Sequence, residues 1–198
     1  MDSLPFSQAC ENNKNPILGV LENAFEQRQR VLEIASGTGQ HACFFANHLP
    51  WLQWQPSELE ESLERLRPRC NTYPGRNLLE PLALDVCDAR WPASHADAVF
   101  TANSLHIMPE SAVRLFFSGL AANLPQDVVL AIYGPFNYDG EYTSQSNAQF
   151  DQWLAAQNPA SAIRDFETVD ELASQAGFTL QKDVEMPANN RLLLWSRT

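Results

Sequence analysis

The stretch VLEIASGTGQHA (31–42) decides the fold. It starts with β-branched and apolar residues around one acid, Glu33, and then runs through Gly37 and Gly39 into a helical pattern. Glycine permits unusual backbone angles and lets a ligand approach the backbone closely. A helix that starts after such a turn offers free N–H groups to that ligand. The stretch therefore predicts a buried strand, a glycine turn and a helix that together can hold a ligand.

Strand-like and helix-like segments alternate along most of the chain. Strands are predicted at 30–35, 51–56, 81–86, 96–105 and 127–136, and helices at 40–49, 57–69 and 109–124. The helix at 57–69 starts with a capping-box pattern, Ser57 three residues before Glu60. After residue 136 a polar loop leads to a helix, a second helix ends at Gly177, and two strand-like runs joined by ANN suit an antiparallel connection at a sheet edge. This alternation favours an α/β fold with a parallel sheet covered on both faces.

Composition limits the classes of function. The chain has 198 residues and a net charge of −11, and its Lys and Arg residues form no cluster. Such a surface repels phosphate backbones, so we expect a small-molecule substrate and no nucleic-acid partner. The four cysteines form no CxxC pair and no apolar run reaches membrane-spanning length. We therefore expect one cytoplasmic domain over 1–198, without a metal, a secretory signal or a membrane partner. The sequence leaves the oligomeric state open.

Three acids are predicted near the carboxyl ends of successive strands. Glu33 would repel the pyrophosphate of a dinucleotide and would suit the ammonium group of S-adenosylmethionine. Glu58 lies 19 residues beyond Gly39, a spacing at which an acid can accept both ribose hydroxyls. Asp85 is placed to accept the adenine amino group.

Each of these acids also has a purely structural reading. Glu33 could cap local N–H groups, Glu58 could be a helix-start glutamate, and Asp85 could cap a loop. The run from Gly37 to Ala42 also fits the dinucleotide fingerprint G-x-G-x-x-A, which leaves a nicotinamide cofactor open. The charge of Glu33 favours S-adenosylmethionine, a sulfonium compound, over a nicotinamide dinucleotide.

The glycine turn also resembles a known motif. VLEIASGTG resembles the first motif of class I S-adenosylmethionine-dependent methyltransferases, an acid followed by Gly-x-Gly-x-Gly, with Ala35 at the first glycine. The segments NPIL, VLEIASGTGQH, WQPSE, SNAQFDQWL, IRDFE and MPANN together resemble a methyltransferase-like family long filed as a domain of unknown function. The resemblance runs from about residue 9 to 197. It implies a Rossmann-like fold, a seven-stranded, mostly parallel doubly wound sheet whose last strand is antiparallel.

The resemblance, together with the three acids, suggests which residues hold the cofactor and where the chain folds over it. We expect S-adenosylmethionine to be bound by Glu33, Ala35, Gly37, Thr38, Gly39, Glu58, Asp85, Val86 and Asn103. Residues 1–25 would form a cap segment close to the cofactor, and 137–166 an insertion on the substrate side. The family usually has an acid, an arginine and an asparagine in the cap segment. Here CENNKNPIL has Glu11, Asn12 and Asn13, so the arginine is missing.

Candidate catalytic and substrate-binding residues follow the fourth and fifth strands and occupy the family-like segments. His106 could act as a general base, and Tyr133 could steady a sulfonium through its aromatic face; a purely structural His106 is an equal alternative. The candidate substrate ligands are Asn12, Asn13, Tyr138, Asn147, Arg164, Asn189 and Asn190. Alternatively, Arg164 forms a structural ion pair with Asp165, and Asn189 and Asn190 form the hairpin turn.

The leading hypothesis is methyl transfer from S-adenosylmethionine to an unidentified small molecule. A non-catalytic cofactor-binding or scaffold protein is the main alternative, because no unmistakable catalytic residue is present. A nicotinamide-dependent oxidoreductase is a weaker one, disfavoured by Glu33.

Overall fold

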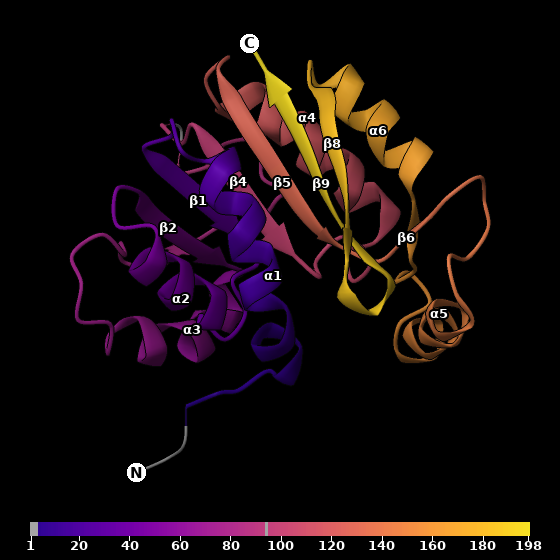
Figure 1. Cartoon of the computed structure of the whole chain (residues 1–198), viewed down its shortest axis with the longest axis horizontal. Coiled ribbons are helices and arrows are strands. Elements are labelled where there is room, and N and C mark those ends of the chain that lie inside the picture. Colours follow the sequence, from indigo (N-terminus) through magenta and orange to yellow (C-terminus); the bar gives the residue numbers. More distant parts are fainter. Residues whose placement is uncertain (1–3, 94) are drawn as a thin grey trace.

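A seven-stranded sheet forms the centre of the molecule (Figure 1), seen in a computed structural model that describes residues 4–93 and 95–198. Its order is β3-β2-β1-β4-β5-β9-β8. The strands are β1 (Arg30–Ile34), β2 (Gln53–Glu58), β3 (Leu82–Ala83), β4 (Ala98–Ala102), β5 (Val128–Gly134), β8 (Thr179–Met186) and β9 (Asn190–Arg197). The first five strands of this order, β3, β2, β1, β4 and β5, pair in parallel with their neighbours. Strand β9 is antiparallel to both β5 and β8. The mostly parallel sheet with an antiparallel last strand is confirmed.

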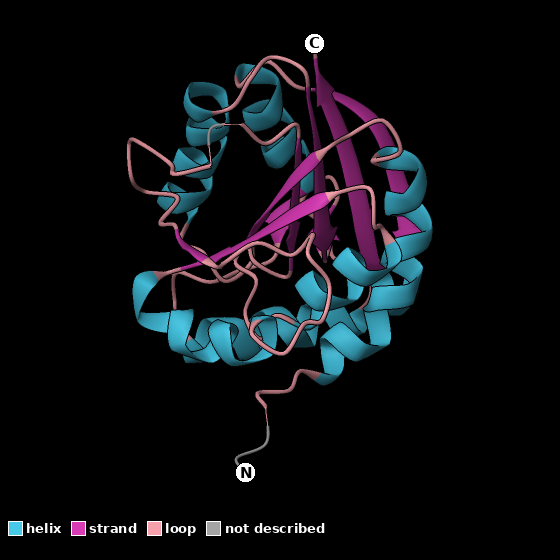
Figure 2. Ribbon diagram, turned by 90° about the vertical axis from the view of Figure 1, so that its left-hand side faces the viewer, coloured by secondary structure: helices cyan, strands magenta, loops and turns pink. Residues whose placement is uncertain are grey.

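Helices cover both faces of the sheet, as Figure 2 shows. They are α1 (Gln8–Ala24), α2 (Gln40–His48), α3 (Leu63–Cys70), α4 (Glu110–Asn123), α5 (Gln145–Gln157) and α6 (Phe166–Gln175). Alternate residues of each strand face opposite sides. Leu32 of β1 therefore belongs to a core with α4 and α6, while Val31 belongs to a core with α1 and α2. Two buried layers, one on each face, thus hold the strands in place. Together they position the edge of the sheet at which the carboxyl ends of the parallel strands lie. Among the described residues, no helix combines the length and hydropathy needed to cross a bilayer.

The segment between β5 and α6 leaves the sheet and returns to it. The two-residue strands β6 (Phe136–Asn137) and β7 (Arg164–Asp165) pair in parallel beside the main sheet. The segment between β6 and β7, which includes α5, therefore leaves and rejoins the rest of the protein at this strand pair. In Figure 1 α5 lies below the carboxyl ends of the strands, apart from the other helices.

Several predicted boundaries were wrong. The capping box is wrong because Ser57 lies inside β2, where its Oγ donates to the carbonyl of Glu33 at 2.7 Å; α3 begins only at Leu63, after a short 3₁₀ helix (Glu60–Ser62). The third strand has two residues instead of six, because the chain turns away after Ala83. The helix α1 and the pair β6–β7 were not predicted at all. A second 3₁₀ helix (Pro187–Asn189) connects β8 to β9, which confirms the short antiparallel connection.

Candidate functional site

The glycine turn after β1 is built from left-handed backbone. Ala35, Gly37 and Gly39 have φ values of 58°, 56° and 74°. The positive φ of Gly39 favours glycine, and a Cβ added there would lie 2.9 Å from Leu66 Cδ1 of α3, so the leucine side chain would have to shift. A Cβ added at Gly37 would meet open space. The turn therefore presents its backbone to an open region next to the start of α2.

Ala35 has the unusual conformation that its place in the motif demands. A non-glycine residue with positive φ is strained, because Cβ crowds the following carbonyl. Asn103, at the end of β4, also has a positive φ, 57°. These two residues lie at the tips of neighbouring strands, and both line two adjoining cavities, a small pocket and a large cleft. Two residues with positive φ thus lie at the point where the cavities meet.

A small pocket of about 430 Å³ opens beside the tips of β1, β2 and β4. Glu58, Asp85, Val86 and Asn103 line it, and most of the remaining wall is apolar. Glu58 accepts hydrogen bonds from the amides of Gly37 (2.9 Å) and Leu59 (3.0 Å). Asp85 accepts one from the amide of Cys87 at 2.8 Å. Both carboxylates are therefore held by backbone N–H groups and face one shared hollow.

Glu33 lies behind the turn and lines neither cavity. Its side chain is 2% exposed and accepts a hydrogen bond from Trp54 Nε1 at 2.8 Å. Burial raises the pKa of Glu33 to about 8, so the group is mainly protonated at neutral pH. The structure thus brings two of the three acids together and places the third in the core below them.

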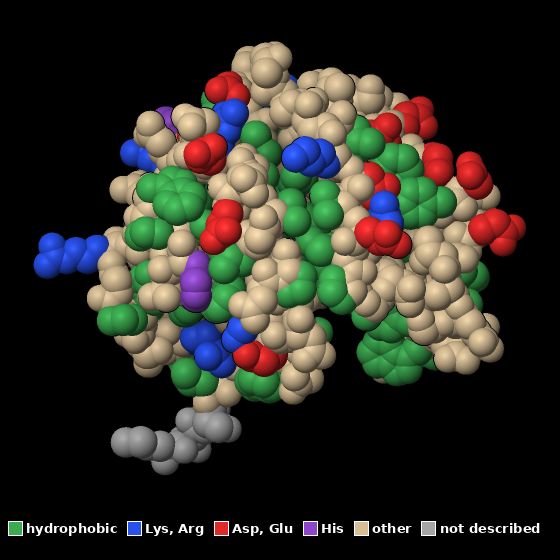
Figure 3. Space-filling view, in the orientation of Figure 1, with side chains coloured by type: hydrophobic (Ala, Val, Ile, Leu, Met, Phe, Trp, Pro, Cys, Tyr) green, Lys and Arg blue, Asp and Glu red, His purple; other side chains and the backbone are tan. Residues whose placement is uncertain are grey.

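A large cleft of about 1170 Å³ adjoins the small pocket. It is shared by segments from most of the chain: the start of α1, the glycine turn, the residues after β4 and β5, α5 and the β8–β9 connection. Figure 3 shows the corresponding hollow at the lower edge of the molecule, between the part that carries α1 and the lobe of α5. Ala35, Ala102, Asn103 and Ile107 line both the cleft and the pocket, so the two are continuous.

The wall of the large cleft includes a buried polar chain. The Oδ1 of Asn13 lies 2.7 Å from Nε2 of His41. Burial lowers the pKa of His41 to about 4, with a further contribution from Lys14. Burial raises the pKa of Tyr133, and a hydrogen bond with Asn13 opposes this. Asn13 therefore pairs with the neutral imidazole of His41 on the wall that also holds the phenol of Tyr133.

His106 forms a second part of the wall. Its ring packs edge-on against Phe150 of α5, with centroids 5.3 Å apart. Burial lowers its pKa to about 4; the charge of Arg164 acts in the same direction and that of Asp151 opposes it. At neutral pH the imidazole is therefore uncharged and has one nitrogen able to accept a proton.

The predicted substrate ligands divide into two groups. Asn12, Asn13, Asn147 and Asn190 line the large cleft, whereas Tyr138, Arg164 and Asn189 do not. Among the cofactor candidates, Gly37 and Thr38 line the cleft and Gly39 is packed against α3.

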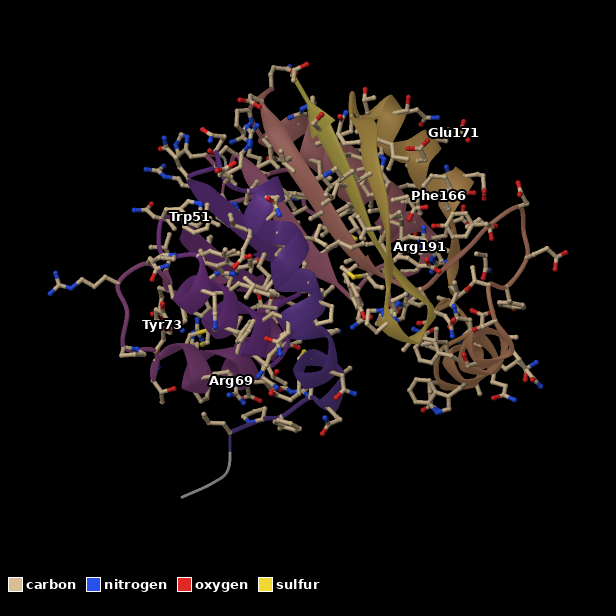
Figure 4. The ribbon with its side chains drawn as sticks, in the orientation of Figure 1. Trp51, Arg69, Tyr73, Phe166, Glu171 and Arg191 are labelled. Atoms are coloured by element: carbon tan, nitrogen blue, oxygen red, sulfur yellow. The ribbon has the colours of Figure 1, made fainter. Side chains whose placement is uncertain are left out.

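The residues outside the lining have structural contacts. The guanidinium of Arg164 donates to the carbonyls of Leu105, Met108 and Ala160, so it holds the segment that carries His106. Tyr138 stacks on Phe166 and its hydroxyl donates to Asp183, in the region where Figure 4 labels Phe166 and Arg191.

Asn147 and Asn189 join α5 to the hairpin. Asn147 Nδ2 donates to the carbonyl of Asn189 at 3.2 Å and to Thr143 Oγ1 at 2.9 Å. Asn189 has a positive φ of 56°, in agreement with the turn-forming alternative. In the described part of the chain, no three His, Cys, Asp or Glu residues are grouped so that they could hold a metal ion.

Comparison with known proteins identifies the family. Residues 4–197 match a family described as "Protein of unknown function (DUF938)". The chain belongs to the DUF938 family. This match covers nearly the whole chain and agrees with the resemblance in the six sequence segments.

The DUF938 chain also has the fold of S-adenosylmethionine-dependent methyltransferases. An O-methyltransferase family 2 protein from Planctomyces limnophilus, solved with apigenin, gives a TM-score of 0.83 at 16% identity, over 96% of this chain and 58% of that one. An O-methyltransferase family protein from Burkholderia thailandensis gives 0.81 at 17%, over 93% and 56%. Human N-acetylserotonin methyltransferase, solved with SAM, gives 0.80 at 12%, over 96% and 53%. The DUF938 chain therefore spans little more than half the length of these proteins.

Sequence reasoning missed part of the cleft wall of the DUF938 chain. Phe6, Arg65, Phe150 and Trp153 all line the large cleft. Phe150 and Trp153 lie within SNAQFDQWL, from which only Asn147 was taken as a ligand. Their three-residue spacing, which puts both on one side of a helix, was the available signal. Arg65 and Phe6 had no such signal, since their place in the cleft depends on how α3 and the start of the chain pack.

Proposed function

We propose that this protein binds S-adenosylmethionine and transfers its methyl group to a small molecule. The observation that carries the proposal is the small pocket, with Glu58 and Asp85 facing a mostly apolar hollow that opens past Asn103 into the large cleft. A nucleoside offers a ribose diol and a flat base, and these match two acceptors and apolar walls. The fold shared with S-adenosylmethionine-dependent methyltransferases supports the same choice.

The residues at the site fit this cofactor. Glu58 would accept hydrogen bonds from the ribose hydroxyls and Asp85 from the adenine amino group, with Val86 packing beside the base. Gly37 leaves open space in front of the turn, where a ligand can approach the backbone. Glu33 is predicted to support the methionine part, and from its buried position it would do so through the turn rather than by direct contact.

The bound cofactor would supply an activated methyl group on a positively charged sulfur, and the acceptor that receives it would have a proton to lose. The protein's task is then to align the acceptor and to exclude water. His106 on the cleft wall is the candidate base for that proton, and its pKa of about 4 makes it a weaker base than an ordinary histidine. Tyr133 and Asn13 would orient the acceptor from the wall next to the turn.

Calorimetric titration with S-adenosylhomocysteine tests cofactor binding, with a nicotinamide dinucleotide as the competing ligand. We expect one molecule of S-adenosylhomocysteine bound per chain and no heat from the dinucleotide. Absence of both heat and thermal stabilisation at millimolar S-adenosylhomocysteine would rule the proposal out, as would stabilisation by the dinucleotide alone. Transfer from S-adenosylmethionine carrying a labelled methyl group, supplied with metabolite extracts, then tests for catalysis; cofactor binding without any labelled product would indicate a non-catalytic protein.

A further inference from the structure

The charge of the large cleft differs from that of the whole protein. The chain carries 24 Asp and Glu residues against 13 Lys and Arg, a net charge of −11. Yet no Asp or Glu is among the described residues that line the cleft, and Arg65 of α3 is. The described lining of the cleft is thus free of acidic side chains, although acids outnumber bases in the protein as a whole.

The histidines of the lining do not change this balance. His41 and His106 are both buried, and their lowered pKa values leave them neutral at neutral pH. The carboxylates nearest to the turn, Glu58 and Asp85, line the small pocket, where the nucleoside would lie. Glu33 is in the core and mainly protonated. A positively charged acceptor would therefore find no carboxylate on the cleft wall, and it would face both Arg65 and the sulfonium of the cofactor.

Aromatic side chains set the shape of the cleft. Phe150 and Trp153 of α5 stack with centroids 5.9 Å apart and an interplanar angle of 14°. Trp153 is 56% exposed and Phe6, from the segment before α1, is 62% exposed. Both line the cleft although they are far apart in the sequence. Exposed aromatic faces that line one hollow favour a flat, apolar ligand.

Uncharged amides supply the polar contacts. Asn12, Asn13, Asn147 and Asn190 line the cleft. The oxygens of Asn12 and Asn13 are engaged within the protein, which leaves their Nδ2 groups to donate to a ligand. The Nδ2 groups of Asn147 and Asn190 already donate within the protein, which leaves their oxygens to accept. Such groups can bind a hydroxyl, a carbonyl or a carboxylate without adding charge.

We infer that the methyl acceptor is a flat aromatic compound without positive charge, either neutral or anionic, held between the aromatic residues of α5 and Phe6. The inference rests on the proposed function, since the sulfonium adds to the charge that a cation would meet. It narrows the acceptor to compounds such as phenols and aromatic acids and excludes protonated amines.

Three naphthalene derivatives of similar size test the charge preference. They are 2-naphthol (neutral), 2-naphthoate (anionic) and 2-naphthylmethylammonium (cationic), titrated calorimetrically at neutral pH with and without saturating S-adenosylhomocysteine. We expect the neutral and anionic probes to bind about tenfold more tightly than the cation in both series. Equal or tighter binding of the cation, or no binding of any probe, would overturn the inference.

A charge variant shows whether the cleft wall causes the preference. Asn12→Asp places a carboxylate on the wall and keeps the oxygen that accepts from Gln8 Nε2. Asn23→Asp adds the same charge to the exposed far end of α1, outside the cleft lining. We expect the preference over the cation to shrink severalfold in Asn12→Asp and to stay unchanged in Asn23→Asp. Equal changes in the two variants would show that net charge, not the cleft, decides binding.

An aromatic pair of variants tests the place of binding. Trp153→Ala should weaken both well-bound probes about tenfold. Trp51→Ala removes another partly exposed tryptophan, 47% exposed, on the side of the molecule far from α5 (Figure 4), and should leave the affinities unchanged. Unchanged affinity in Trp153→Ala would overturn the inference. The cofactor titration keeps the two proposals apart: if S-adenosylhomocysteine binds but the cation is preferred, the acceptor class alone is wrong.

Discussion

The small pocket and the large cleft adjoin at one edge of the sheet but are built from different parts of the chain. The small pocket uses residues that directly follow strands, Ala35 after β1, Glu58 at the end of β2 and Asn103 after β4. The cleft gathers residues from Phe6 to Asn190, and α1 and α5 each contribute to its wall. The pocket is therefore a local product of parallel strands that end together, whereas the cleft exists only once distant segments have packed.

The difference extends to buried titratable groups. Behind the pocket lies an acid, Glu33, whose pKa is raised, and in the cleft wall lie two bases, His41 and His106, whose pKa values are lowered. Burial favours the neutral form in each case. The two regions should therefore limit the stability of the protein at opposite ends of the pH range.

The largest effect is expected for Glu33. Its pKa is raised to about 8, so its contribution to stability is complete at low pH and is lost as the pH rises from about 4.5 through 8. Glu33→Gln keeps an oxygen for Trp54 Nε1 and removes the titration. Between pH 5 and 9 the free energy of unfolding of the wild type should fall by about 4 kcal/mol more than that of the variant. Urea unfolding at several pH values measures this; Glu22→Gln, an exposed site on α1, is the control. Parallel pH profiles for all three proteins would contradict it.

The opposite pH dependence of stability is expected for His106 in the cleft wall. The lowered pKa of His106, about 4, means that stability is present above pH 6.5 and is lost as the pH falls towards 4. Between pH 7 and pH 4.5 the free energy of unfolding of His106→Gln should therefore fall by about 2 kcal/mol less than that of the wild type. Urea unfolding is again the measurement, with His95→Gln at an exposed residue as the control. A loss in His106→Gln as large as in the wild type would show that its imidazole is not held neutral.

The sequence predicted the pocket better than the cleft, for physical reasons. An acid at the end of a strand is a local signal, and Glu58 and Asp85 of the pocket were found from it. Glu33 was correctly placed inside the first strand, but the strand alone could not show on which face Trp54 would meet it. The orientation of the Glu33 side chain depends on the register of β1 with β2, and packing of the core sets that register.

The cleft residues lacked comparable signals. The helix α1 was missed because Pro16 and a polar first half hide its weak amphipathic pattern. Arg164 read as a substrate ligand or an ion-pair partner of Asp165, yet it bonds backbone carbonyls that only the folded loop after β4 brings near. Long-range packing of this kind leaves no periodic trace in the sequence.

A smaller effect should distinguish the pocket from its surroundings. Glu58→Gln keeps the shape of the side chain, but it replaces one of the two oxygens that accept from Gly37 and Leu59 with an amide nitrogen and makes a weaker acceptor for a diol. The affinity for S-adenosylhomocysteine should fall about tenfold, while Glu60→Gln, in the exposed 3₁₀ helix just beyond, should leave it unchanged. Calorimetry measures both affinities. Equal affinities in Glu58→Gln and wild type would remove the acid from the cofactor site and with it the main support for a nucleoside in the small pocket.

The smallest effect is expected at Ala35, where the pocket and the cleft meet. Its φ of 58° strains an alanine, so Ala35→Gly should raise the free energy of unfolding by up to about 1 kcal/mol. Ala42→Gly, inside α2, should lower it by about 1 kcal/mol or more, because glycine weakens a helix interior and the lost methyl is buried. Thermal unfolding of the two variants shows whether each substitution raises or lowers the free energy of unfolding. Destabilisation by both would mean that Ala35 stabilises the fold through its Cβ contacts, and the junction would then be a packed support rather than a strained one.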